Sequence, residues 1–106
     1  MTWARVAPLT DVRPGQGKGI AIGGRTIALF NAAGTVYAVD DECPHAKSGR
    51  LSAGTLEDLS VWCPLHDACF DLVTGAILSP PAGETMDEGV RVYTVKILDG
   101  DIYLAL

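Results

Sequence analysis

The sequence predicts an all-β fold made of short antiparallel strands, and two observations carry that prediction. Stretches rich in β-branched and aromatic residues alternate with glycine, asparagine and aspartate residues that favour turns. No segment of about ten residues or more shows the apolar period of 3.6 that marks an amphipathic helix, although residues 52–59 have room for one helical turn. Sheets are therefore expected along the whole chain.

The N-terminal part is expected to form an antiparallel meander of four strands. Gly23 and Gly24 supply a two-residue hairpin turn, and residues 31–34 supply a slightly longer turn in which Gly34 is free to take positive φ. The glycine-rich segment 15–19 lacks the strand-then-helix context of a nucleotide-binding loop and is interpreted as a plain loop. The expected strands are 2–7, 19–22, 25–31 and 35–40.

A terminal hairpin is the firmest structural expectation. Side chains alternate along 90–97, Asp99-Gly100 forms a turn, and 101–106 returns as the last strand. Residues 41–88 between the two ends are rich in loops and contain every cysteine and histidine of the chain. Weak strand signals within this middle part fall at 61–63, 69–72 and 76–78.

Length and charge restrict the class of protein. A chain of 106 residues is long enough for one domain and too short for two, so residues 1–106 are expected to share one core. The net charge of −5 opposes nucleic acid or anionic lipid as a partner and favours a basic face on another protein. No apolar run has the length of a signal peptide or a membrane span, so a cytoplasmic protein is expected.

Two Cys-His pairs are the strongest chemical signal in the chain. Cys43-Pro44-His45 is followed after seventeen residues by Cys63-Pro64-Leu65-His66, and both histidines of the protein fall in this pattern. One buried cysteine or histidine alone has an ordinary structural explanation, but the four together indicate a metal centre. Tetrahedral zinc remains an alternative, although zinc sites commonly pair cysteines first and histidines afterwards.

The order of these residues resembles the Rieske family, in which two cysteines bind one iron of a [2Fe-2S] cluster and two histidines bind the other. The resemblance covers essentially the whole chain. Besides the Cys-His pairs, four further segments resemble this family: 36–40, 51–54, 70–75 and 79–82. The last of them is similar to the proline-containing third loop that shields the cluster from water.

This resemblance implies a fold of stacked antiparallel sheets with a smaller cluster-binding subdomain at about 41–82. It implies one [2Fe-2S] cluster per chain, held by Cys43, His45, Cys63 and His66, with the imidazole rings at the surface as the electron path. Cys69, three residues past His66, is then a spare thiol. The first ligand loop is one residue longer than the usual pattern of the family.

A chain of this length is similar to the ferredoxins of ring-hydroxylating oxygenases, which are electron carriers and not enzymes. It would take one electron from a flavoprotein reductase and deliver it to a non-haem iron oxygenase with a basic docking face. The alternatives are the small subunit of an assimilatory nitrite reductase and a zinc-stabilised interaction module. The acidic run 40–42 is either a solvated turn or part of the docking surface, and Trp3 and Trp62 are expected to serve packing.

The resemblance also implies a reduction potential at the low end of the Rieske range. High-potential members carry an extra cysteine in each ligand loop, and the matching positions here are Ser48, or a neighbour, and Leu65. Those members also place Ser and Tyr hydroxyl groups near the cluster sulfurs, where this chain has Ala68 and Phe70. Asp67 adds a negative charge beside His66, which opposes reduction further.

Overall fold

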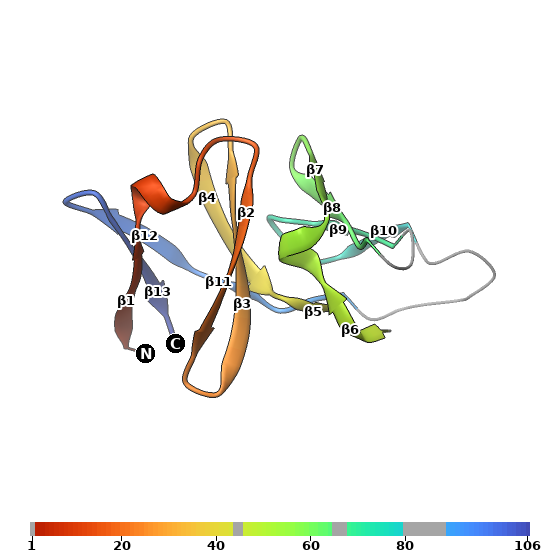
Figure 1. Cartoon of the computed structure of the whole chain (residues 1–106), viewed down its shortest axis with the longest axis horizontal. Coiled ribbons are helices and arrows are strands. Elements are labelled where there is room, and N and C mark those ends of the chain that lie inside the picture. The colour runs from red at the N-terminus through yellow and green to blue at the C-terminus, as the bar shows by residue number, and fades with distance from the viewer. Residues whose placement is uncertain (1, 44–45, 65–67, 80–88) are drawn as a thin grey trace.

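The computed structural model describes residues 2–43, 46–64, 68–79 and 89–106, with the backbone alone at 43 and 46–49. These residues form antiparallel sheets arranged in three layers, with the four-stranded sheet β11-β4-β3-β2 in the middle (Figure 1). No helix among them is long and apolar enough to cross a membrane. The strands of the middle sheet are β2 (Gly17–Ile22), β3 (Arg25–Ala32), β4 (Thr35–Asp40) and β11 (Val92–Tyr93).

Two further sheets flank the middle one, and a short hairpin extends from it. The first flanking sheet has the order β1-β13-β12, with strands β1 (Trp3–Pro8), β12 (Val95–Leu98) and β13 (Asp101–Ala105). The second has the order β10-β9-β8-β7, with strands β7 (Thr55–Glu57), β8 (Ser60–Trp62), β9 (Cys69–Asp71) and β10 (Ile77–Ser79). The hairpin pairs β5 (Glu42–Cys43) with β6 (Ala46–Arg50), and the two 3-10 turns are η1 (Leu9–Asp11) and η2 (Leu51–Ala53).

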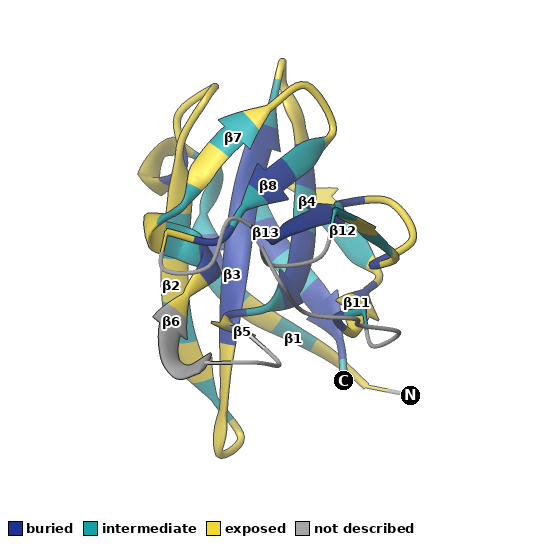
Figure 2. Ribbon diagram, turned by 90° about the vertical axis from the view of Figure 1, so that its right-hand side faces the viewer, coloured by how far each residue is buried: buried dark blue, intermediate teal, exposed yellow. Residues whose placement is uncertain are grey.

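Strand β3 is buried on both faces, because each face packs into a different hydrophobic core (Figure 2). Successive side chains of a strand point to opposite sides. Ile27 and Leu29 therefore pack with the sheet of β1 and β13, whereas Ala28 and Phe30 pack with β8, β9 and η2. The stacked antiparallel sheets expected from the sequence are confirmed.

The expected meander of four N-terminal strands is wrong for its first strand, because β1 pairs with β13 and belongs to a flanking sheet. Tight turns set the register of the other three strands, β2, β3 and β4. Gly23 and Gly24 have φ values of 58° and 77°, and Ala33 and Gly34 have 53° and 97°. Positive φ at both central residues is the mark of the two-residue hairpin turn that matches the twist of the strands. The turn at 31–34 is shorter than expected, because Ala32 already pairs with Thr35.

The expected loop at 15–19 is wrong for its second half, where β2 begins at Gly17. The glycines serve close packing at this point. A Cβ atom on Gly17 would lie 2.7 Å from Cε1 of Phe30, and one on Gly19 would lie 2.9 Å from Oδ2 of Asp41. A strand with larger side chains would be held away from these neighbours.

The terminal hairpin is confirmed, but its first strand is not continuous over 90–97. Val92 and Tyr93 pair with β4, whereas Val95–Leu98 pairs with β13, so the chain changes sheets at Thr94. Alternation of side chains continues through such a switch and gives no sign of it. This segment thereby connects the middle sheet with the outer one.

In the middle of the chain the three weak strand signals correspond to β8, β9 and β10. The helical turn lies at Leu51–Ala53, and 55–57, which was expected to share that turn, is strand β7. Trp62 is partly buried, but Trp3 is 41% exposed and Lys96 Nζ lies 4.4 Å from the centre of its ring. The packing role expected for Trp3 is therefore wrong.

Candidate metal centre

The first Cys-His segment falls at the end of the β5–β6 hairpin. Cys43 on β5 pairs with Ala46 on β6. His45 itself lies outside the described residues. Because β5 follows β4 after a single residue, Cys43 is held by the end of a strand that belongs to the middle sheet.

The second Cys-His segment falls between β8 and β9. The backbone N–H of Cys63 donates a hydrogen bond of 2.7 Å to the carbonyl oxygen of Ala68, which closes the connection over four residues. His66 belongs to that connection in sequence and lies outside the described residues. Cys63 is 3% exposed, and it shares a hydrophobic core with Ala68 and Phe70. Each predicted Cys-His pair thus begins at the point where a hairpin closes.

The acidic run at 40–42 is not a solvated turn throughout, and its expected part in a docking surface stays a prediction. Asp41 is 1% exposed, and its Oδ1 accepts a hydrogen bond of 2.7 Å from the backbone N–H of Ser52. Asp40 accepts a hydrogen bond from Tyr93, and Glu42 is exposed. Of these three residues only Glu42 is exposed, while Asp41 is a buried structural residue. Its neighbours in sequence gave no signal of this burial.

Cys69 lies on β9, opposite Trp62, and is 4% exposed. Burial raises the pKa of its thiol, and a hydrogen bond involving Ser60 opposes part of that increase. A protonated thiol inside a strand is a poor metal ligand. This environment agrees with the prediction that Cys69 is not a ligand, which remains a prediction.

The donor set fits a [2Fe-2S] cluster of the Rieske type. Two thiolates and two imidazoles are the ligands that such a cluster needs, and the described backbone places Cys43 and Cys63 each at the point where a hairpin closes. Within the described part of the chain, no group of three or more Cys, His, Asp or Glu residues could hold a metal ion. Of the four predicted ligands, Cys63 is the one whose side chain lies within the described part of the chain.

The chain belongs to the Rieske-like [2Fe-2S] domain family, whose model matches residues 2–105. This membership agrees with the three-layered fold, with the two hairpins and with the Cys-His segments that they carry. The protein is accordingly a Rieske-type electron carrier with a [2Fe-2S] cluster.

Known proteins similar to this chain include ferredoxin components of dioxygenase systems. The ferredoxin subunit of 3-phenylpropionate/cinnamic acid dioxygenase from Escherichia coli is 40% identical over 100 residues, which are 93% of this chain and 89% of that protein. A chain in the complex of reduced oxygenase and oxidised ferredoxin of carbazole 1,9a-dioxygenase has a TM-score of 0.84 and 29% identity, with coverage of 97% and 92%.

A protein described as the small subunit of an NADH-dependent nitrite reductase from Mycobacterium tuberculosis has a TM-score of 0.83 and 26% identity, with coverage of 97% of this chain and 93% of that one. The oxygenase ferredoxin expected from the sequence and its nitrite reductase alternative are therefore both represented among similar structures.

Proposed function

We propose that Cys43, His45, Cys63 and His66 hold the cluster, and that the chain carries single electrons without being an enzyme itself. The observation that supports this assignment is the closure of each hairpin at its Cys-His segment, through the Cys43–Ala46 pair and the Cys63–Ala68 hydrogen bond. Rigid supports of this kind fix ligands that come from separate parts of the chain. The supporting region corresponds to the cluster-binding subdomain proposed at 41–82, within one domain of residues 1–106.

The chemistry follows from the ligand types. Thiolates are anionic and imidazoles are neutral, so two histidines lower the negative charge of the site and raise its potential above that of all-cysteine ferredoxins. A bound Rieske cluster accepts and releases one electron. The chain supplies the ligands and keeps water from Cys63, which lies in the core with Ala68 and Phe70. The histidines form the proposed path for the electron to a docked partner.

The proposed partners are a flavoprotein reductase, which donates the electron, and a terminal non-haem iron oxygenase, which receives it. Support comes from the dioxygenase ferredoxin subunit of Escherichia coli and from the oxygenase–ferredoxin complex to which this chain is similar. The net charge of −5 favours a basic docking face on the partners. We place this exchange in the cytoplasm.

A second candidate function is that of a nitrite reductase small subunit, because a protein with that description shares the fold at 26% identity. Rapid mixing separates the two functions. The reduced protein is mixed with the oxygenase component of a 3-phenylpropionate dioxygenase system or with the large subunit of a nitrite reductase. Faster reoxidation by the oxygenase supports the first function. Reoxidation only by the large subunit of the nitrite reductase, together with a stable complex in gel filtration, would replace the first function by the second.

A further inference from the structure

The 3-10 turn η2 contacts the supports of both predicted ligand segments, and the first contact is made by Asp41. The carbonyl oxygen of Asp41 accepts a hydrogen bond of 2.8 Å from the N–H of Leu51, and its Oδ1 accepts one of 2.7 Å from the N–H of Ser52. The N–H of Asp41 donates to the carbonyl oxygen of Thr26 at 3.0 Å. One residue thus ties the base of the β5–β6 hairpin to η2 and to the middle sheet.

The side chain of Asp41 has little freedom to move. It is 1% exposed, and its Oδ2 accepts no hydrogen bond among the described residues, although Arg50 Nη1 lies 3.8 Å away. Gly19 leaves room for this oxygen, because a Cβ atom there would lie only 2.9 Å from Oδ2. A buried carboxylate with one unbonded oxygen is costly to maintain. The hydrogen bond from the N–H of Ser52 to Oδ1 offsets part of that cost and fixes the side chain against η2.

The second contact of η2 is made at Gly54, the residue that follows it. A Cβ atom on Gly54 would lie 2.0 Å from the carbonyl oxygen of Trp62. Trp62 ends β8 and directly precedes Cys63. The backbone at the end of η2 therefore packs directly on the backbone that carries the second ligand segment, and only glycine permits that approach.

We propose that η2 sets the separation of the two ligand segments, with Asp41 as the positioning residue for the first and Gly54 for the second. The inference rests on the proposed ligand assignment. Cys43 lies two residues beyond Asp41, and Cys63 lies one residue beyond the carbonyl group that Gly54 contacts. A change at either contact shifts one ligand segment against the other, without touching a ligand.

The test compares cluster properties of folded variants. Asp41→Ala removes the acceptor for Ser52, and Gly54→Ala pushes against Trp62. Both should change the g-values of the reduced-state EPR spectrum. Both should also speed iron release to a chelator by about tenfold, which corresponds to about 1.4 kcal/mol and to the lower end of a hydrogen bond with a charged group. Asp41→Asn keeps an oxygen acceptor for Ser52, so its g-values and iron release should stay near those of the wild type.

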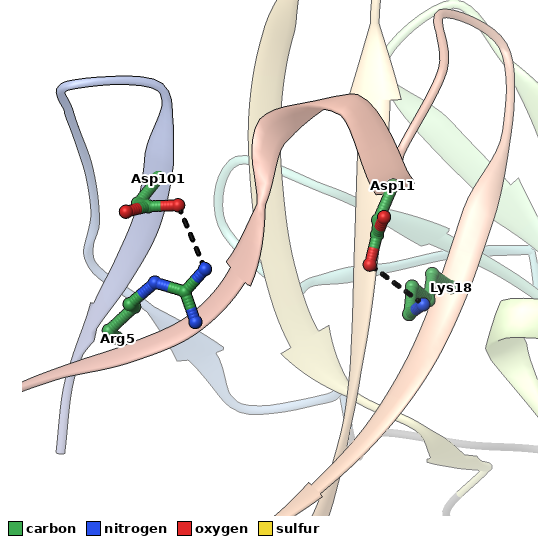
Figure 3. A network of polar contacts seen from close by, with 4 residues as sticks. All are labelled: Arg5, Asp11, Lys18 and Asp101. Atoms are coloured by element: carbon green, nitrogen blue, oxygen red, sulfur yellow. Dashed lines mark hydrogen bonds and ion pairs between the residues drawn. The ribbon is translucent and has the colours of Figure 1, made fainter.

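Asp101→Ala is the matched control, because it also removes one carboxylate. Asp101 accepts a hydrogen bond of 3.0 Å from Arg5 on the opposite side of the molecule from the ligand hairpins (Figures 1 and 3). If Asp41→Ala does not fold, Asp41→Glu replaces it, since this change keeps the carboxylate and displaces it by one methylene group.

Three outcomes decide the proposal. Altered g-values and faster iron release in the Asp41 and Gly54 variants, with a normal Asp101 variant, support it. Lower thermal stability with wild-type g-values and iron release would show a merely structural role and overturn it. Absence of a [2Fe-2S] signal from the wild-type protein would overturn the ligand assignment together with this proposal. The second outcome leaves the assignment intact.

Discussion

The hydroxyl group of Tyr93 donates a hydrogen bond of 2.6 Å to Oδ1 of Asp40. Tyr93 lies on β11 and is 7% exposed, and Asp40 ends β4, three residues before Cys43. The N–H of Asp40 also donates to the carbonyl oxygen of Arg91 at 2.9 Å. These two hydrogen bonds thereby connect the region of β11 to β4, the strand that leads into the first ligand hairpin.

Tyr93→Phe should lower the free energy of unfolding by about 1–2 kcal/mol, because it leaves the partly buried carboxylate of Asp40 without this donor. Chemical denaturation followed by far-UV circular dichroism measures this difference. Tyr103→Phe is the matched control, since Tyr103 lies on β13 in a flanking sheet, whereas Tyr93 lies in the middle sheet. Equal stability of the Tyr93 variant and the wild type would show that the hydrogen bond contributes nothing.

The same hydrogen bond predicts a pH dependence at the alkaline end. Burial, and then the hydrogen bond with Asp40, raises the pKa of Tyr93 above its ordinary value of 10. The folded protein therefore retains this proton more tightly than the unfolded chain. The corresponding stability is fully present below pH 10 and is lost as the pH rises through the folded pKa. Tyr93→Phe should remove this part of the loss of stability at alkaline pH. An unchanged loss of stability in the variant would show that Tyr93 does not cause it.

Cys69→Ser should leave the cluster in place, because Cys69 lies within β9 and its thiol is kept protonated by burial. Cys43→Ser and Cys63→Ser should each bleach the protein. Visible absorption and iron content of the three purified variants measure the difference. A colourless Cys69 variant beside a coloured Cys43 variant would show that Cys69 is the ligand and Cys43 the spare thiol.

The midpoint potential should lie in the lower part of the Rieske range of roughly −150 to +300 mV. Ala68 and Phe70 occupy the positions of the hydroxyl donors in high-potential members, and both are fully buried. Ala68→Ser should raise the potential by adding a donor close to Cys63, whereas the exposed control Ala21→Ser should not change it. Protein-film voltammetry at pH 7 decides: a wild-type midpoint above about +100 mV would refute this prediction.

Electron delivery should slow as salt rises, because a carrier of net charge −5 is guided to a basic partner face by attraction that is screened within about 10 Å at 0.1 M salt. Glu42→Gln should reduce the association rate, since Glu42 is exposed directly before Cys43. Asp99→Asn is the control with the same loss of charge, in the exposed β12–β13 turn. Stopped-flow rates that stay constant over a wide salt range would exclude guidance by charge.

The strands of the meander could be predicted from the sequence because their turns depend on local chemistry. Gly23 and Gly24 mark a hairpin whatever surrounds them. The switch of sheets at Thr94 could not be predicted, because its side chains continue the same alternation while their backbone partners change. Strand β7 was also missed, because the helical turn expected within 52–59 covered its residues.

The candidate ligands could be proposed from spacing, because a metal centre demands particular residue types at short intervals. The residues that support them could not. Asp41 stands between two other acidic residues, and its burial depends on η2, which only the folded chain brings to it. Gly54 has the same difficulty, since its contact with Trp62 depends on the pairing of β7 with β8, and strand β7 was not predicted.

Cys43, His45, Cys63 and His66 are proposed to hold one [2Fe-2S] cluster that carries single electrons. The metal content of the purified protein, together with its EPR spectrum after anaerobic reduction, tests this assignment. We expect about two iron atoms per chain and a reducible [2Fe-2S] signal that is lost in Cys43→Ser and Cys63→Ser and altered in His45→Cys and His66→Cys. A colourless protein with about one zinc ion per chain and no such signal would contradict it.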